Sequence, residues 1–369
     1  MIKIIDTTLR DGLEPVTRKI SLEEKLDFVK LLEKANVPQI EIGAPNAAKD
    51  CLNLLREIKD RNYKIITSGL VYSFGDYQDE SDLLQRSGID ELVVVLPLSE
   101  KRIPYSKKDK IKSLKESINF LKTLENIKLG VGLANSFDVD RNFLYCISEL
   151  ALGLAIDRLI IYDSKGSLFP DEAKETFNIL SRIKDNSKTD LTIHCHNDLG
   201  LATASSIYSI LGGATSIETT VNGVGDRAGN TSFEQVLANL YLLGYETGIK
   251  LDKIIEISNF VEEITGIKKY RCMPIVGEEA YTHVRAQHSK SVIESGDIYT
   301  AIPSEVFGVK QRYSFRLNEP RNQLELIQTI CNKHNLTFDN DILVRLKHLT
   351  RGKGLTEGEI IKVIQNGTK

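Results

Sequence analysis

Short apolar runs alternate with amphipathic stretches from the N-terminus to about residue 245. Most of these runs are continuously apolar, which is typical of parallel strands that are buried on both faces. The pattern predicts eight strands, at Ile2–Asp6, Gln39–Gly43, Lys64–Gly69, Glu91–Leu96, Lys128–Leu133, Arg158–Tyr162, Leu191–His196 and Ser216–Val221.

The stretches between these runs have helical periodicity. Residues Leu22–Lys34 carry apolar side chains at i, i+3, i+4 and i+7, and Ser21 with Glu24 has the spacing of a capping box. Eight strand–helix repeats in so short a segment favour a closed (β/α)8 TIM barrel, an α/β fold. An open, doubly wound parallel sheet is the structural alternative.

The chain changes character after the predicted barrel. Asp252–Thr265 predicts one more helix, and a turn-rich stretch begins at Lys268. Helical patterns then cover Asp339–Thr350 and Thr356–Asn366. We therefore expect a catalytic TIM barrel over residues 1–267 and a small, mainly helical C-terminal subdomain over residues 268–369.

Composition and charge argue against several partners. The 369 residues have a formal net charge of −3, so electrostatics gives no reason to expect nucleic acid or a membrane surface as a partner. No apolar run approaches the ~18 residues of a membrane-spanning helix. The five cysteines are scattered without CxxC pairing, which is typical of a reducing compartment. We expect a cytoplasmic protein.

Polar residues cluster where the predicted strands end, and a barrel places its catalytic groups there. These clusters are Asp6-Thr-Thr-Leu-Arg-Asp-Gly12, Glu41-Ile-Gly-Ala-Pro45, Asp163-Ser-Lys-Gly166, His194-Cys-His-Asn-Asp198 and Asn222-Gly-Val-Gly-Asp-Arg-Ala-Gly-Asn230.

His194 and His196 are two residues apart, so both side chains point to the same face of a strand. An isolated HxH pattern is equally compatible with a satisfied structural pair. At the end of a barrel strand, with Asp11 available across the barrel, the pattern favours a metal site. Two imidazoles and a carboxylate suit Zn²⁺, Mn²⁺, Fe²⁺ or Co²⁺.

Two neighbouring features have a structural and a functional interpretation. Arg10 could pair with a buried carboxylate such as Asp6, or it could stabilise an oxyanion that develops at the metal. The glycines between Gly223 and Gly229 could permit a tight turn or let the backbone approach a ligand. Asn230, at the end of this loop, can offer an oxygen to the metal.

Together these residues resemble the acyl-CoA-dependent, Claisen-condensing barrel enzymes, namely the 2-isopropylmalate, homocitrate and citramalate synthases. Hydroxymethylglutaryl-CoA lyase is a more distant relative in the same superfamily. The resemblance covers nearly the whole chain, because the post-barrel segments are similar as well. Those segments are Met273-Pro-Ile-Val-Gly277, Ala280-Tyr-Thr-His283 and His288.

The resemblance implies a role for each matching residue. It implies a divalent cation (Mg²⁺, Mn²⁺ or Zn²⁺) bound by Asp11, His194 and His196, with Asn230 nearby. It implies an acyl-CoA, with acetyl-CoA expected, and a 2-oxo acid as substrates. The substrate-binding residues would be Arg10, Glu41, Ser164 and Lys165.

In the same family the post-barrel subdomain takes part in catalysis. The resemblance gives His288 the removal of a proton from the acyl-CoA and matches Tyr299 to a tyrosine of this subdomain. Both would act in the barrel of the partner subunit, so the resemblance implies a homodimer. Without the resemblance, the sequence would indicate only that His288 is an exposed surface histidine.

Several positions depart from the family pattern. Leu13 and Glu14 replace Glu-Gln, Phe137 stands where a glutamate assists catalysis, and Asp226 replaces a glutamate. Lys165 adds a cation beside Ser164, which could meet a distal carboxylate of the acceptor or simply face solvent. We therefore expect a divergent synthase. The alternatives are a metal-dependent carbon–carbon lyase or aldolase of the same superfamily, and a non-catalytic homologue.

Overall fold

The computed structural model describes residues 1–45, 50–99, 105–184, 187–296, 298–339, 341–350 and 353–367. Contacts within the chain divide it into two compact units. The first unit comprises Met1–Lys250 with Ile257–Ile267, and the second comprises Leu251–Glu256 with Lys268–Lys369.

The first unit is a closed barrel of eight parallel strands. Strand β1 pairs with β2 on one side and with β8 on the other, so the predicted TIM barrel is confirmed and the open sheet is excluded. The strands are β1 (Lys3–Asp6), β2 (Gln39–Gly43), β3 (Ile66–Tyr72), β4 (Glu91–Pro97), β5 (Lys128–Ala134), β6 (Arg158–Asp163), β7 (Asp190–Cys195) and β8 (Ser216–Thr219).

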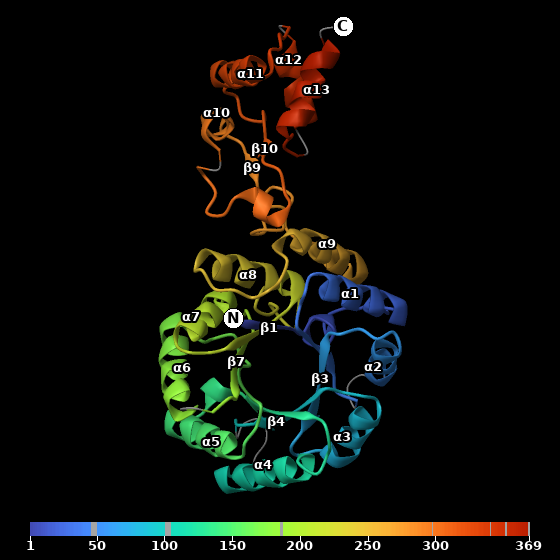
Figure 1. The fold of residues 1–369 in the computed structure, drawn as a ribbon. Coiled ribbons are helices and arrows are strands. Elements are labelled where there is room, and N and C mark those ends of the chain that lie inside the picture. The colour runs from blue at the N-terminus through green and yellow to red at the C-terminus, as the bar shows by residue number, and fades with distance from the viewer. Residues whose placement is uncertain are drawn as a thin grey trace. The chain divides into compact units, whose positions relative to one another are not determined.

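Helices surround this barrel as a ring (Figure 1). They are α1 (Leu22–Lys34), α2 (Asp50–Asp60), α3 (Tyr77–Arg86), α4 (Lys107–Leu121), α5 (Arg141–Gly153), α6 (Pro170–Lys184), α7 (Ala202–Leu211) and α8 (Phe233–Leu242). Helix α1 has its predicted bounds and the predicted capping box, in which the Ser21 side chain accepts from the Glu24 amide and Glu24 caps the Ser21 amide.

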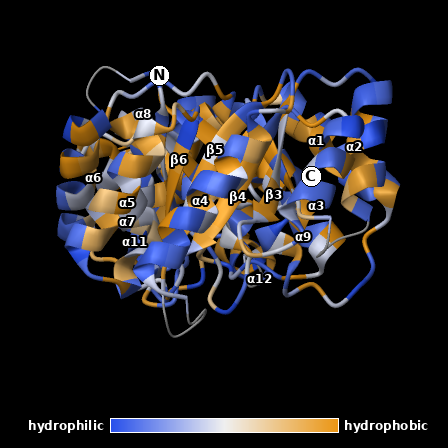
Figure 2. Cartoon of the chain, turned by 90° about the horizontal axis from the view of Figure 1, so that it is seen from below, coloured by the Kyte–Doolittle hydropathy of each residue, from blue (hydrophilic) through white to orange (hydrophobic). Residues whose placement is uncertain are grey.

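The strands are buried on both faces, as their continuous apolar runs predict. Figure 2 shows apolar strands such as β4 and β5 behind helices of mixed hydropathy. The strand bounds differ from their predictions most at β3, which runs from Ile66 to Tyr72 instead of Lys64 to Gly69, and at β8, which ends at Thr219 instead of Val221. Residues up to Tyr72 pair with β4, and this pairing brings Leu70 and Tyr72 to the end of the barrel where catalytic groups gather.

A charged network lies inside the barrel. Arg158 of β6 is 1% exposed, and its guanidinium contacts Glu91 of β4 at 2.7 and 3.0 Å and Glu218 of β8 at 2.7 Å. Gln39 of β2 donates a further hydrogen bond to Glu91. Because buried charges are tolerated only when they are paired and hydrogen-bonded, this network fixes the relative positions of four strands.

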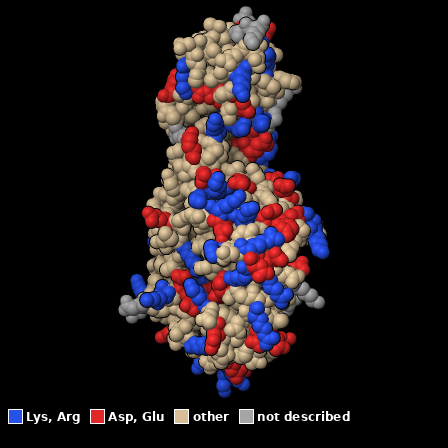
Figure 3. Space-filling view, turned by 45° about the vertical axis from the view of Figure 1, so that its right-hand side comes forward, with Lys and Arg blue, Asp and Glu red and all other residues tan. Residues whose placement is uncertain are grey.

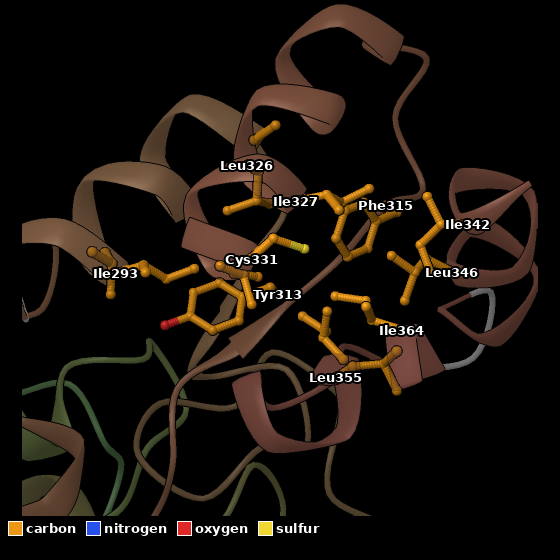
Figure 4. Packing of buried hydrophobic residues seen from close by; sticks show 14 residues of the cluster. Ile293, Tyr313, Phe315, Leu326, Ile327, Cys331, Ile342, Leu346, Leu355 and Ile364 are labelled. Atoms are coloured by element: carbon orange, nitrogen blue, oxygen red, sulfur yellow. The ribbon is translucent and has the colours of Figure 1, made fainter. Parts of the chain in front are cut away.

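The second unit has a hydrophobic core of its own. Apolar residues of its helices and of the short strand pair pack around Tyr313 and Phe315 (Figure 4). Its elements are η4 (Leu251–Lys253), β9 (Thr282–His283), α10 (Ala286–Ser295), η5 (Ser304–Phe307), β10 (Arg312–Tyr313), α11 (Pro320–His334), α12 (Ile342–Leu349) and α13 (Glu357–Gly367). Helix α9 (Ile254–Thr265) begins in the second unit and ends in the first.

The predicted helices at the end of the chain correspond to α12 and α13, although Asn340 lies outside the described residues. Within the described part of the chain, none of the helices has the length and apolar character needed to cross a membrane. Basic and acidic side chains are interspersed over the face of the barrel that Figure 3 shows.

We expect Arg158→Met to lower the free energy of unfolding by about 3–5 kcal/mol, because it removes the guanidinium that neutralises Glu91 and Glu218 inside the barrel. Urea unfolding followed by circular dichroism measures this loss. The matched control is Arg61→Met, since Arg61 pairs with Glu23 at the surface and such pairs contribute at most about 1 kcal/mol. Equal unfolding midpoints for the two variants would contradict the prediction.

Candidate active site

Three potential metal ligands meet at the C-terminal end of the barrel. Asp11 lies in the short helix η1 (Asp11–Leu13) that follows β1, His194 lies in β7, and His196 directly follows β7. Their ligand atoms all lie within 4.8 Å of one another. The two-residue spacing of the histidines directs both rings into the barrel, and the ring centroids are 5.2 Å apart.

Glu218 sets the orientation of the His194 ring. His194 Nδ1 is 2.9 Å from Glu218 Oε2, and this contact turns Nε2 toward Asp11 Oδ2 at 3.0 Å. A histidine that binds metal through Nε2 usually donates its other ring N–H to a carboxylate, which fixes the tautomer. Glu218 also pairs with Arg158, so the buried charge network of the barrel extends to this ring.

The ionisation of these groups follows from their surroundings. Burial disfavours the charged form of Asp11, but Arg10 and then the hydrogen bond from His194 outweigh burial and hold the pKa of Asp11 well below its usual value. Burial also opposes a charged His194, yet hydrogen bonds to Asp11 and Glu218 raise its pKa to about 9. Burial and then the neighbouring His194 lower the pKa of His196 to about 4. A cation bound here would therefore displace a proton from His194.

Arg10 is paired, but its partners are not the suggested Asp6. Arg10 Nε lies 2.5 Å from Glu41 Oε1, and Nη1 lies 3.1 Å from Asp11 Oδ2. Asp6 instead accepts hydrogen bonds from the amide and hydroxyl of Thr8. Glu41 of β2 thus holds the guanidinium beside the Asp11 carboxylate.

The loop after β8 places Asn230 over the same point. Asn230 Nδ2 donates to Asp11 Oδ2 at 2.7 Å. A Cβ atom at Gly225 would lie 1.9 Å from Asn230 Oδ1, so this position of the loop must be glycine for the amide to lie where it does. The glycines of this loop permit a tight turn, as one interpretation of the sequence predicts.

The residues present fit a divalent cation. Among the described residues, several buried polar atoms at this place have no hydrogen-bond partner, namely Arg10 Nη2, Glu41 Oε2, Tyr162 Oη, His196 Nδ1 and Asn230 Oδ1. Buried polar groups are normally satisfied, so such a cluster indicates a polar ligand. Two imidazoles and one carboxylate form the donor set of a Zn²⁺, Mn²⁺ or similar site.

A cavity of about 190 Å³ opens at these groups. Its polar lining residues are Arg10, Asp11, Glu14, Ser164, His194, His196, Asp226 and Arg227. Its remaining lining residues are mainly apolar, namely Leu70, Tyr72, Val95, Pro97, Ala134 and Tyr162. Burial and then the charges of Glu218 and Glu41 raise the pKa of Tyr162, so its hydroxyl stays protonated.

Two predicted site features lie elsewhere. Lys165 lines a neighbouring cavity with Phe143, and its Nζ is 2.5 Å from Asp138 Oδ1. Phe137, the replacement for a family glutamate, lies in the short helix η2 (Ser136–Asp138) and is not among the lining residues of the metal cavity. The ammonium of Lys165 therefore has a carboxylate partner already.

His288 and Tyr299 belong to the second unit. His288 lies in α10 and is exposed, and Tyr299 is 51% exposed. Their rings stack with centroids 4.3 Å apart. The pair therefore lies on the surface of its own unit, and its role in catalysis stays a prediction.

Sequence reasoning missed three groups of the site, of which Tyr162 and Glu14 line the cavity and Glu218 contacts His194. Glu218 and Tyr162 lie on strands, and a period-two count along β8 and β6 marks them as inward-facing. Glu14 lines the cavity, and burial followed by repulsion from Asp11 raises its pKa. Glu14 is one of the positions at which the sequence departs from the family pattern, and this departure could have identified it as a residue of the site.

Comparisons with known proteins agree with this architecture. The family model described as HMGL-like matches residues 1–261. A protein of Archaeoglobus fulgidus provisionally named (R)-citramalate synthase is 30% identical, and the aligned region covers 99% of this chain and 75% of that protein. A homocitrate synthase of Saccharolobus islandicus is 31% identical over 85% of this chain and 69% of its own length.

Solved structures show the same fold. An HMG-CoA lyase from Acinetobacter baumannii, in complex with coenzyme A and 3-methylmalate, superposes with a TM-score of 0.64 at 20% sequence identity. The superposition covers 73% of this chain and 92% of the lyase.

We expect Glu218→Gln to weaken metal binding about 10- to 100-fold, because it removes the carboxylate that orients His194 without removing a ligand. Competition with a chromophoric chelator measures the dissociation constants for Zn²⁺ and Mn²⁺. Glu175→Gln, on the exposed side of α6, is the control and should bind the metal as the unchanged chain does. Equal affinities for the two variants would show that Glu218 does not orient the site.

Proposed function

Since this chain belongs to the HMGL-like family, we propose that it is a metal-dependent acyltransferase that condenses an acyl-CoA with a 2-oxo acid. The products would be a 2-hydroxy di- or tricarboxylic acid and free CoA. The observation that carries the proposal is the cluster of Asp11, His194 and His196 with Arg10 beside it, at the end of the barrel where such enzymes hold their substrates.

The relatives support this reaction class. The similar proteins from Archaeoglobus fulgidus and Saccharolobus islandicus carry the names of citramalate and homocitrate synthases. The latter relative is aligned over 85% of this chain, and the former over nearly all of it, so the likeness includes residues beyond the barrel. Acetyl-CoA is the donor that we expect.

A divalent cation held by Asp11, His194 and His196, with Asn230 close by, would polarise the carbonyl group of the 2-oxo acid as a Lewis acid. Arg10 donates toward the same carbonyl oxygen and stabilises the charge that develops there. Glu41 keeps the Arg10 guanidinium in place, and Ser164 offers its hydroxyl to the acceptor's carboxylate.

A base removes a proton from the carbon next to the thioester carbonyl, and that carbon forms a bond to the carbonyl carbon of the 2-oxo acid. The former carbonyl oxygen takes up a proton and becomes the hydroxyl group. Water then cleaves the thioester, which releases the thiol of CoA and a carboxylate.

We assign the base to His288, supported in place by Tyr299, and the assignment rests on the family resemblance. Both residues are exposed on the second unit, so the stacked pair is accessible to another molecule. In the proposed homodimer, residues 268–369 of one subunit complete the active site in the barrel of the other.

We expect the chain to release CoA from acetyl-CoA only when a 2-oxo acid and a divalent cation are present. A thiol reagent detects this release with pyruvate, 2-oxoisovalerate, 2-oxoglutarate and oxaloacetate in turn. His194→Ala should abolish the release, whereas His348→Ala, on α12 of the second unit, should not change it. If no CoA is released with any acceptor although metal is bound, the proposal is contradicted. CoA-dependent cleavage of a 2-hydroxy acid would indicate a lyase instead.

Mixing two inactive variants tests the shared site. If His288 acts in the partner's barrel, His194→Ala and His288→Ala chains unfolded and refolded together should recover about a quarter of the activity, because half of the symmetric dimers are mixed and each has one intact site. The control is the same mixture of each variant with itself. No recovery from a mixture that contains mixed dimers would show that His288 acts within its own chain or not at all.

A further inference from the structure

Tyr162 lies between the polar and the apolar side of the metal cavity. It is the fifth residue of β6, points into the barrel and is 7% exposed. Its ring centroid is 4.8 Å from that of His194. On its other side it belongs to an apolar cluster that includes Val95 and Ala134. A molecule bound at His194 would therefore contact the Tyr162 ring.

The hydroxyl group of Tyr162 has no partner within the described part of the chain. Its Oη atom is fully buried, and no hydrogen bond to it is formed. A buried hydroxyl without a partner is unfavourable, so its position points to a ligand oxygen in the cavity. Arg10, which lines the same cavity, also has a buried atom without a partner, Nη2.

Strand β5 leaves room for the ring. A Cβ atom at Gly132 would lie 2.6 Å from Tyr162 Cε2 and 3.3 Å from Tyr162 Oη. No side chain can occupy this position of β5 while the ring of Tyr162 stays where it is. Glycine inside a strand commonly marks such a close approach. Glycine at position 132 is therefore required for the Tyr162 ring to occupy its observed position.

The wall beyond Tyr162 is apolar. It is formed by Leu70, Tyr72, Val95, Pro97 and Ala134. Among the described residues, the arginines that line the cavity are Arg10 and Arg227, and each already pairs with two carboxylates. A second carboxylate on the acceptor would find neither an unpaired guanidinium nor a polar wall here.

We propose that Tyr162 is a specificity-determining residue that selects 2-oxo acids with a short, uncharged side chain. The acceptor's side chain packs against the apolar wall, the Tyr162 ring limits its length, and the Tyr162 hydroxyl donates a hydrogen bond to an acceptor oxygen. This inference rests on the proposed function and names the acceptor class of that same site.

Binding of acceptors to the full-length, Mn²⁺-loaded chain in the absence of acyl-CoA tests the inference. Isothermal titration calorimetry compares pyruvate, 4-methyl-2-oxopentanoate and 2-oxoglutarate. The unchanged chain should bind pyruvate most tightly. Tyr162→Phe should weaken pyruvate binding about 3- to 10-fold through the lost hydrogen bond, with little change in the order of preference.

Removing the ring should change that order. Tyr162→Ala should raise the affinity for 4-methyl-2-oxopentanoate relative to pyruvate by about 10-fold or more, because apolar pockets discriminate added methylenes on that scale. Tyr162→Leu gives the same comparison if the alanine variant does not fold. Tyr208→Phe and Tyr208→Ala, on the outward side of α7, are the controls. An unchanged order in Tyr162→Ala or Tyr162→Leu, or tightest binding of 2-oxoglutarate by the unchanged chain, would overturn the inference.

The same variants separate this inference from the proposed reaction. If the unchanged chain binds acceptors in a Tyr162-dependent order but releases no CoA, the condensation is wrong and the role of Tyr162 stands. If the chain condenses an acceptor while every Tyr162 variant keeps its affinities and order, the role of Tyr162 is wrong and the condensation stands.

Discussion

The guanidinium of Arg158, buried between Glu91 and Glu218, is the interaction on which the site depends. Two carboxylates and a guanidinium can remain charged inside a barrel only if each finds a partner, so the strands that carry them cannot shift relative to one another. Glu218 connects this network to the candidate site, because its second oxygen contacts His194 Nδ1 and so fixes the position of the His194 ring. The ring then faces Asp11 in a fixed orientation before any ligand arrives.

The cavity above this network has two chemically different sides. Its charged and hydrogen-bonding groups come mainly from η1 and the residues beside it, from the end of β7 and from the loop after β8. The apolar wall comes from β3, β4 and β5, at the positions of Leu70, Val95 and Ala134. Tyr162 joins the two sides with an apolar ring and a polar hydroxyl. A substrate with a charged head and an apolar side chain matches this division.

The second unit has the properties that the proposed reaction requires of it. Its core of apolar residues around Phe315 allows it to hold α10 rigidly without help from the barrel. Rigid support would matter for His288 in its proposed role, because a base must approach its proton within hydrogen-bond reach. The stacked ring of Tyr299 restricts the histidine further while leaving it exposed.

The sequence alone determined the barrel and the approximate strand positions, and it indicated Asp11, His194 and His196 as candidate metal ligands. Continuous apolar runs predict buried strands, and the spacing of His194 and His196 puts both on one face. The sequence could not identify Glu218, Arg158 or Tyr162 as parts of the site. Their roles depend on which strands meet in the barrel, and the two carboxylate partners of Arg158 lie 60 or more positions away in the chain. Lys165 shows the same limit, because its neighbour Ser164 lines the cavity while Lys165 pairs with Asp138 outside it. Only the closed tertiary structure decides such pairings. A buried charge is unfavourable unless it is paired, and the fold determines which oppositely charged group lies close enough to pair with it.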